Sequence, residues 1–197
     1  MKLYAGEQPF AKEELVTLDE VVASVLAMSG DGVLVIGVDG RSGGGKTTFA
    51  KALAEKLGAS LLSTDDFAWW HSLFDWPEML IENAVVPLRA GKAIDFKPPA
   101  WVDREREGSI VAPASKYVIV EGIGSTQPAM RNHLDVRIWV QTDADVARER
   151  GLLRDLAERP DPAEAERFWN EWQVAEDEFQ AKAQSWLVAD FVVSGQA

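Results

Sequence analysis

A glycine-rich stretch with a single lysine is the part of this sequence best suited to chemistry. Residues 40 to 47 read Gly-Arg-Ser-Gly-Gly-Gly-Lys-Thr and match the pattern G-x-x-x-x-G-K-[ST] of a phosphate-binding loop. Glycines let backbone N–H groups converge on a polyphosphate. Lys46 adds a positive charge, and the Thr47 hydroxyl can ligate Mg²⁺. The residues expected to contact a nucleotide are Gly40, Arg41, Ser42, Gly43, Gly44, Gly45, Lys46, Thr47 and Thr48.

Carboxylates follow two other apolar segments. Asp65 comes after residues 59–63, and Glu121 comes after residues 117–120. The carboxyl ends of strands form the ligand crevice of an open α/β sheet, so both acids are expected beside the loop. Asp65 can accept a proton from an attacking hydroxyl or help to hold Mg²⁺. The alternative is that Asp65 and Asp66 cap the next helix.

Two further acid and arginine patterns leave alternatives open. Asp39 ends the first apolar segment, where it could support Mg²⁺ from a distance or serve only as a turn residue. Arg150 and Arg154 share one face of a predicted helix and could close over a transferring phosphoryl group. They could instead pair with neighbouring acids on a solvated face. We expect residues 145–162 to form a lid.

Aromatic residues are concentrated between residues 66 and 110. Aromatic loops beside a phosphate site suit a flat acceptor such as a nucleobase or a sugar face. Trp70 and Trp101 are the candidates for this contact, although packing beneath a loop is the alternative for each. The region is therefore predicted to bind the phosphoryl acceptor.

The elements that must position these residues alternate between strand and helix. The loop lies between an apolar segment at 33–38 and a helical pattern at 49–57. About five parallel strands in a three-layer α/β/α sandwich are predicted, within one domain spanning residues 1–197. Further expected elements are an opening helix over 10–28, a helix over 78–89, short strands near 94–96, a short helix over 127–133, strands at 136–140 and 190–193, and a long helix over 162–183.

Composition excludes several classes of function. The net charge of −12 argues against a surface for nucleic acid or an anionic membrane, since both require clustered Lys and Arg. The absence of cysteine excludes disulfides, thiolate zinc sites and cysteine nucleophiles. The chain shows neither an apolar signal core nor a membrane-length apolar run, so we expect a cytoplasmic location. Exposed tryptophans could form a homodimer surface or serve the lid or pocket.

Taken together, these segments resemble the uridine kinase-like branch of P-loop nucleoside and nucleotide kinases, from about Val33 to Val193. The matching segments are residues 39–48, 64–67, 74–78, 87–91, 120–122, 142–145, 150, 153–155 and 189–193. The resemblance implies that Asp65 is the catalytic base and that Thr47 and Glu121 lie on the magnesium side. It also implies that Lys46, Arg150 and Arg154 form the phosphate clamp and lid, and that Asp75 holds ribose hydroxyls.

The sequence departs from that family in two places. Gly151 stands where the family often has a second arginine, and residues 97–104 lack clear counterparts of the Tyr and His that contact the pyrimidine. Phosphoryl transfer is therefore better supported than uridine as the acceptor. The leading hypothesis is an ATP- and Mg²⁺-dependent kinase that acts on a small-molecule hydroxyl, first of all a nucleoside. The alternatives are a pantothenate-like, sugar or nucleotide acceptor, or a nucleotide-binding regulatory protein without one.

Overall fold

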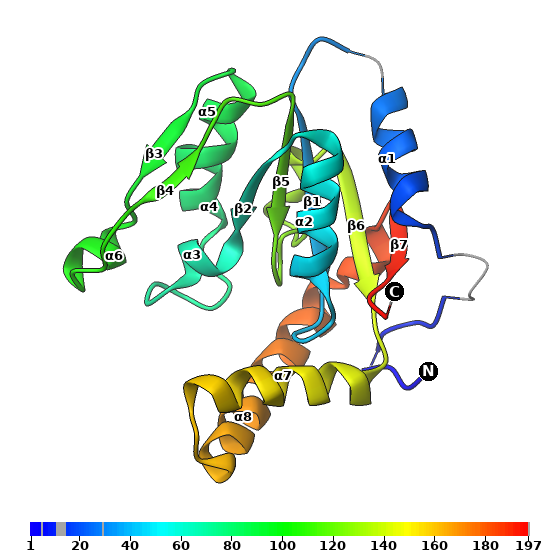
Figure 1. Cartoon of the computed structure of the whole chain (residues 1–197), viewed down its shortest axis with the longest axis vertical. Helices are drawn as coiled ribbons and strands as arrows, with labels where there is room; N and C mark the ends of the chain where they lie inside the picture. Colours follow the sequence, from blue (N-terminus) through cyan, green and yellow to red (C-terminus); the bar gives the residue numbers. More distant parts are fainter. Residues whose placement is uncertain (5, 11–14, 29, 197) are drawn as a thin grey trace.

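A five-stranded parallel sheet forms the centre of the molecule. The computed structural model describes residues 1–4, 6–10, 15–28 and 30–196. The strand order is β2-β5-β1-β6-β7, so β1 is central and the loop that follows it lies in the middle of one sheet edge (Figure 1). The strands are β1 (Leu34–Gly40), β2 (Ser60–Ser63), β5 (Tyr117–Glu121), β6 (Val136–Gln141) and β7 (Phe191–Ser194). The predicted parallel sheet is confirmed.

Helices cover both faces of this sheet. On one face, α1 (Leu18–Ala27) and α2 (Lys46–Leu57) bury Val21, Val25 and Leu53 against the strands. On the other face, Phe67, Trp76 and further apolar side chains form a second core cluster. That layer contains α3 (Thr64–Ala68), α4 (Pro77–Leu80), the π-turn η2 (Ile81–Val85), α5 (Val86–Arg89), α6 (Pro99–Asp103) and the 3₁₀ turn η4 (Ser185–Val188). The α/β/α sandwich follows from these two apolar interfaces.

Two structural units extend beyond the sandwich. An antiparallel hairpin pairs β3 (Ile94–Phe96) with β4 (Ile110–Ala112). A helical hairpin of α7 (Ala144–Glu158) and α8 (Pro162–Ala183) extends past the carboxyl edge of the sheet (Figure 1). None of the helices formed by the described residues combines the length and apolar character needed to cross a membrane.

The opening helix is shorter than the sequence predicted. Residues 11–14 of the predicted helix lie outside the described residues, and the helix itself begins at Leu18. Thr17 caps it, because the Thr17 side chain accepts from the Glu20 N–H while the Glu20 carboxylate reaches back to Thr17. Val16 makes a parallel bridge to Val193, so its apolar side chain belongs to the sheet edge and not to a helix face.

The predicted helix over residues 127–133 is also wrong in extent. Only the 3₁₀ turn η3 (Arg131–His133) forms there. Successive i to i+3 bonds, such as Met130 N–H to the Gln127 carbonyl, build consecutive turns in place of an α-helix. The segment's start is fixed by Thr126, which donates through its N–H and its hydroxyl to one oxygen of Asp39.

Asp39 joins two loops at the sheet edge. Its side chain is fully buried and accepts four hydrogen bonds, from the N–H groups of Gly40, Gly124 and Thr126 and from the Thr126 hydroxyl, at 2.8 to 3.2 Å. A buried carboxylate is tolerated only when such donors surround it. Asp39 therefore anchors the loop after β5 to the end of β1, which is more than either role considered from the sequence.

Helices α7 and α8 pack together where Gly151 faces Trp169. A Cβ on Gly151 would lie 1.7 Å from an atom of the Trp169 ring, which is buried. This contact gives a physical reason for the glycine that departs from the family pattern. Any larger side chain at this position would have to push α7 and α8 apart.

We predict that Gly151→Ala destabilises the protein by about 1–2 kcal/mol. Alanine gains about 1 kcal/mol in helix propensity, but overpacking against a rigid buried ring costs up to about 3 kcal/mol. Denaturant unfolding of both proteins measures the difference in free energy of unfolding. Gly32→Ala is the matched control, because a Cβ there meets nothing within 4 Å. A Gly151→Ala protein as stable as the wild type would contradict the packing argument.

Candidate active site

The glycine-rich loop adopts a conformation that requires glycine at two points. Gly43 has φ of +70°, and a Cβ there would lie 2.1 Å from the Ala147 carbonyl oxygen at the start of α7. Gly45 has φ of +91° and caps α2. Among the described residues, no acceptor bonds the N–H groups of Lys46, Thr47 and Thr48, which form the first turn of α2. The positive end of this helix is therefore available to an anion.

Lys46, Thr47 and Glu121 meet at the end of the central strands. Lys46 is buried, and its Nζ donates to the Arg41 carbonyl oxygen at 2.8 Å. Thr47 Oγ1 donates to Glu121 Oε2 at 3.2 Å. Burial raises the pKa of Glu121, and the charge of Lys46 partly opposes that rise. The Thr47 hydroxyl and the Glu121 carboxylate are thus in contact, and the positive charge of Lys46 is near enough to act on that carboxylate.

The strand register brings Asp65 to the same place. Ser63 of β2 lies beside Glu121 of β5, and Asp65 follows two residues later in the first turn of α3. The negative charge of Asp65 contributes to the raised pKa of Glu121. Asp66 has a different environment, because its carboxylate accepts from Arg106 at 3.0 Å. Of the two adjacent acids, Asp65 is the one that faces the loop and Glu121.

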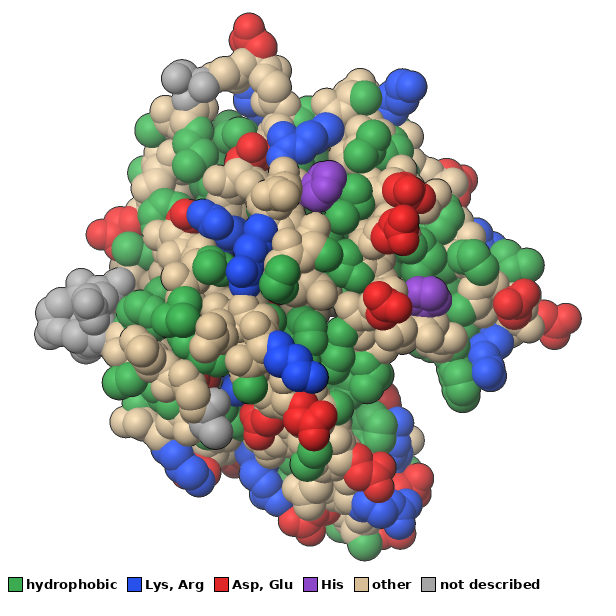
Figure 2. Space-filling model, turned by 180° about the vertical axis from the view of Figure 1, so that it is seen from behind, with side chains coloured by type: hydrophobic (Ala, Val, Ile, Leu, Met, Phe, Trp, Pro, Cys, Tyr) green, Lys and Arg blue, Asp and Glu red, His purple; other side chains and the backbone are tan. Residues whose placement is uncertain are grey.

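A single cavity of about 1400 Å³ contains these groups. The space-filling view shows the molecule hollowed between the part that carries α3 and the α7–α8 hairpin (Figure 2). The polar residues that line the cavity are Ser42, Lys46, Thr47, Thr48, Asp65, His71, Ser72, Glu121, Arg150, Arg154, Asp155, Glu158, Arg159 and Ser194. The predicted loop, acids and lid arginines therefore share one space.

The lid arginines reach the cavity from α7. Arg150 donates to the Gly195 carbonyl oxygen at 2.6 Å, and Arg154 pairs with the buried Asp155 at 3.0 Å. Arg148 lies on the other side of the helix, where it pairs with Glu166 of α8 at 2.7 Å. Both predicted clamp residues are thus on the cavity wall, even though each also has a protein partner.

The aromatic candidates separate into one exposed and one buried residue. Trp70 is 64% exposed, lines the cavity and has φ of +53°, which is a strained conformation for a non-glycine residue. The guanidinium of Arg104 lies 3.4 Å from its ring centroid. Trp101 is buried, and its indole N–H donates to the Asp66 carbonyl oxygen. Trp101 packs in the core and does not line the cavity, so its placement favours the alternative of packing beneath a loop over contact with the acceptor.

Asp75 does not line the cavity either. Its side chain is exposed on the segment between α3 and α4, and its carbonyl oxygen contacts the His71 ring. The role that the resemblance implied, holding ribose hydroxyls, is not supported by this placement. Asp75 lies in the turn before the buried Trp76, and it points outward. The Trp76 indole N–H donates to the Leu73 carbonyl oxygen across this turn.

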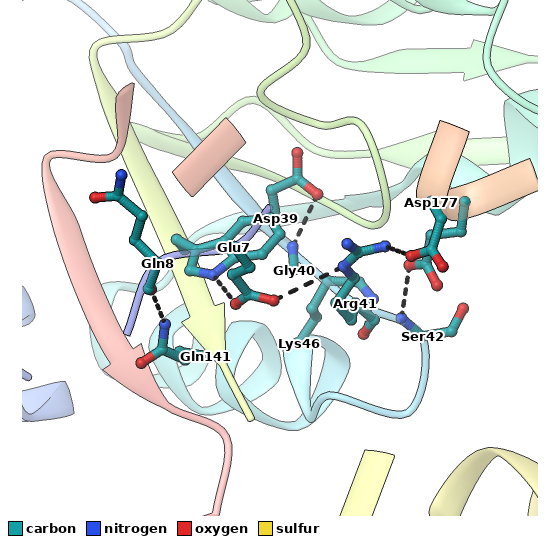
Figure 3. Close-up of polar contacts among 11 residues, drawn as sticks. Glu7, Gln8, Asp39, Gly40, Arg41, Ser42, Lys46, Gln141 and Asp177 are labelled. Atoms are coloured by element: carbon teal, nitrogen blue, oxygen red, sulfur yellow. Dashed lines mark hydrogen bonds and ion pairs between the residues drawn. The ribbon is translucent and has the colours of Figure 1, made fainter. Parts of the chain in front are cut away.

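Three of the nine residues expected to contact the nucleotide lie outside the cavity wall. Gly40, Arg41 and Gly44 do not line the cavity. Arg41 is only 2% exposed and reaches away from the cavity toward Asp177 of α8 (Figure 3). An ion pair at 2.6 Å holds the guanidinium there, so this placement does not support a contact of the Arg41 side chain with a nucleotide. The other six residues line the cavity, and their contact with a nucleotide stays a prediction.

Several site residues carried no recognisable motif. The α8 side chains of Trp172, Glu176 and Asp177 contact Arg41 or Ser42. One signal was available in the sequence: Glu176 follows Trp172 by four residues, which places an acid on the apolar stripe of the long helix. Ser194 and Gly195 offered no signal, because they reach the cavity only through the position of β7.

Comparison with known proteins places the chain among kinases. A uridine kinase of Ligilactobacillus salivarius (strain UCC118) is 31% identical over 146 residues, which span 64% of this chain and 68% of that protein. A uridine kinase of Staphylococcus haemolyticus (strain JCSC1435) is 32% identical over 145 residues, with 64% and 70% covered. A scan against models of protein families found no match.

Solved structures show the same fold. A possible uridine kinase from Bacillus stearothermophilus superposes with a TM-score of 0.60 and 20% identity, covering 89% of this chain and 96% of that one. A D-glycerate 3-kinase from Cryptococcus neoformans has a TM-score of 0.51 and 14% identity, with 84% and 89% covered. With its phosphate-binding loop, its fold and these relatives, the chain belongs to the uridine kinase family and is a phosphotransferase that acts on a hydroxyl group of a small molecule.

Proposed function

We propose that this enzyme uses ATP with Mg²⁺ and transfers the γ-phosphoryl group to a hydroxyl of a nucleoside. One observation carries the proposal: Lys46, Thr47, Asp65 and Glu121, from three neighbouring strand ends, share a cavity with the exposed ring of Trp70. Nucleotide phosphates, a proton acceptor and a stacking surface are thus available in one place.

The donor groups fit Mg²⁺. Thr47 and Glu121 would hold the ion, which would neutralise developing charge on the phosphates, and Asp65 would stay free to take a proton. Mg²⁺ in such sites usually takes one or two carboxylates plus substrate phosphates, and does not need a dedicated protein cage. In keeping with this, no group of three His, Cys or acidic side chains among the described residues forms a metal cage.

Asp65 is suited to the role of general base. Its carboxylate is exposed in the cavity, so it can accept a hydrogen bond from an acceptor hydroxyl. As the hydroxyl oxygen bonds to the γ-phosphorus and the bond to the β–γ bridging oxygen breaks, the proton passes to Asp65 and ADP leaves. Lys46, Arg150 and Arg154 offset the negative charge of the transferring group.

The cavity is large enough for two substrates. Small-molecule sites typically measure about 300–1,000 Å³, so a cavity of about 1400 Å³ leaves room for an acceptor beside the nucleotide. Its apolar wall contains Phe49, Trp69, Trp70, Leu73, Phe168 and Trp172. A flat base suits this wall, whereas a regulatory nucleotide-binding protein would need no such room.

A panel of acceptors tests the proposal directly. Nucleosides, sugars, pantothenate and nucleotides are each added to the enzyme with ATP and Mg²⁺, and ADP release is followed. We expect nucleosides to accelerate ADP formation and to be converted to monophosphates. Acceleration by sugars or pantothenate alone would move the acceptor to another class, and no acceleration with tight ATP binding would favour a regulatory protein.

Asp65→Asn should reduce turnover at least about a hundredfold while leaving ATP affinity unchanged. The amide cannot take the proton, and general-base catalysis contributes about 10²–10⁴-fold. Steady-state kinetics with the best acceptor and calorimetric titration with ATP measure the two quantities. Asp66→Asn, beside it in sequence but paired with Arg106, is the control expected to keep most turnover. Equal turnover in Asp65→Asn and wild type removes Asp65 from this role.

Trp70→Ala should raise the KM of a nucleoside acceptor about tenfold and leave the KM of ATP unchanged. Base–aromatic stacking is worth about 1–3 kcal/mol per base by alanine substitution. Trp70→Phe keeps a ring at the same position and should retain most of the affinity. The idea of a stacking wall is abandoned if the alanine variant binds nucleosides as well as the wild type does.

A further inference from the structure

A charged network lies behind the phosphate-binding loop, on the side away from the cavity. The Arg41 guanidinium lies 2.6 Å from Asp177 of α8 and 3.8 Å from Glu7 of the N-terminal segment. The ring of Tyr4 covers it, with the guanidinium carbon 4.4 Å from the ring centroid. Arg41 therefore holds together three segments that are distant in the sequence (Figure 3).

Ser42 is held from the same helix by two hydrogen bonds. Its backbone N–H donates to Glu176 Oε1 at 2.9 Å, and its Oγ accepts from the Trp172 indole N–H at 2.6 Å. Glu176 is fully buried and does not line the cavity. Its carboxylate thus acts on the loop through the backbone, from a place where it cannot contact a bound nucleotide.

Glu176 belongs to the supporting arm of the lid hairpin. Helix α8 packs on α7 where Gly151 meets Trp169, and α7 carries Arg150 and Arg154. One rigid helix therefore contacts both the loop that meets the phosphates and the helix that carries the lid arginines. The position of the loop and the position of the lid depend on the same element.

We propose that Glu176 is a positioning residue that holds the phosphate-binding loop in its binding conformation through the Ser42 N–H. The inference rests on the proposed use of ATP and extends it to a residue outside the cavity. A loop ordered before binding does not have to be ordered by the ligand, so affinity for the phosphates rises. Without Glu176, the Ser42 N–H has no acceptor in a buried setting, and the loop must rearrange to satisfy it.

The groups around Glu176 favour a fixed hydrogen bond at this point. Burial raises the pKa of Glu176, with a smaller contribution from Asp177, and the charges of Lys46 and Arg41 oppose that rise. Either form of the carboxyl group offers an oxygen to the Ser42 N–H. Glutamine offers the same acceptor without a charge, which separates hydrogen bonding from electrostatics.

The test compares Glu176→Ala, Glu176→Gln and the exposed control Glu178→Ala on the same helix. Dissociation constants for ATP and for adenosine are measured by titration of the full chain. We expect Glu176→Ala to weaken ATP binding at least tenfold, about 1.4 kcal/mol, with adenosine affinity within twofold of wild type. Glu176→Gln should stay within threefold for ATP, and Glu178→Ala should match the wild type.

Three results would overturn the assignment. They are unchanged ATP affinity in Glu176→Ala, an equal loss for ATP and adenosine, and a loss in Glu176→Gln as large as in the alanine variant. If Glu176→Ala does not fold, Asp177→Ala is used in its place, because it releases Arg41 from the same helix. Asp177→Ala should weaken ATP binding at least threefold and leave adenosine binding unchanged. Unchanged ATP affinity in Asp177→Ala would also overturn the assignment. A wild-type protein that fails to bind ATP defeats the proposed function itself, and the inference with it.

Discussion

The parallel register of three adjacent strands is the constraint on which the site depends. Val38 of β1 lies beside Glu121 of β5, and Ser63 of β2 lies beside that same residue. Because all three strands run in one direction, the segments that follow them emerge at one edge. The strand register therefore brings the phosphate-binding loop, Asp65 and Glu121 together at that edge.

Charge is distributed so that an acidic protein can bind an anion. The net charge is −12, whereas the charges on the cavity wall are balanced: four acids (Asp65, Glu121, Asp155 and Glu158) face four cations (Lys46, Arg150, Arg154 and Arg159), and the open N-terminal end of α2 adds positive character. Two buried acids beside the loop accept hydrogen bonds from the protein: Asp39 accepts four, and Glu176 accepts one from the Ser42 N–H. The electrostatic field inside the cavity, and not the net charge of the protein, acts on a nucleotide that binds there.

The loop's own sequence explains only part of its shape. Gly43 and Gly45 permit its backbone angles, but glycines favour many conformations and select none. One conformation of the loop is stabilised by residues outside it, through the contacts of Arg41 and Ser42 with α8 and the N-terminal segment. The glycines of the loop thus allow its conformation, and residues outside the loop stabilise that conformation.

The sequence alone determined the fold class, the phosphate-binding loop, and the acids and arginines around it. Those features depend on local patterns, such as apolar runs, glycines and helical spacing, which can be recognised in the sequence without knowing the fold. It predicted the C-terminal end of α2 and both ends of α8 well, because Gly58 follows the first helix and Pro162 begins the second; α2 itself begins three residues earlier than the pattern at 49–57 indicated.

Only the tertiary structure decided which aromatic residues face the cavity and what lies behind the loop. Trp70 and Trp101 look alike in sequence, and whether each is exposed depends on how α3 and α6 pack against the sheet. Arg41 matched a position in a phosphate-binding motif, but partners more than a hundred residues away draw it to the opposite side. Long-range contacts of this kind leave no local pattern, because the residues that make them meet only when the chain has folded.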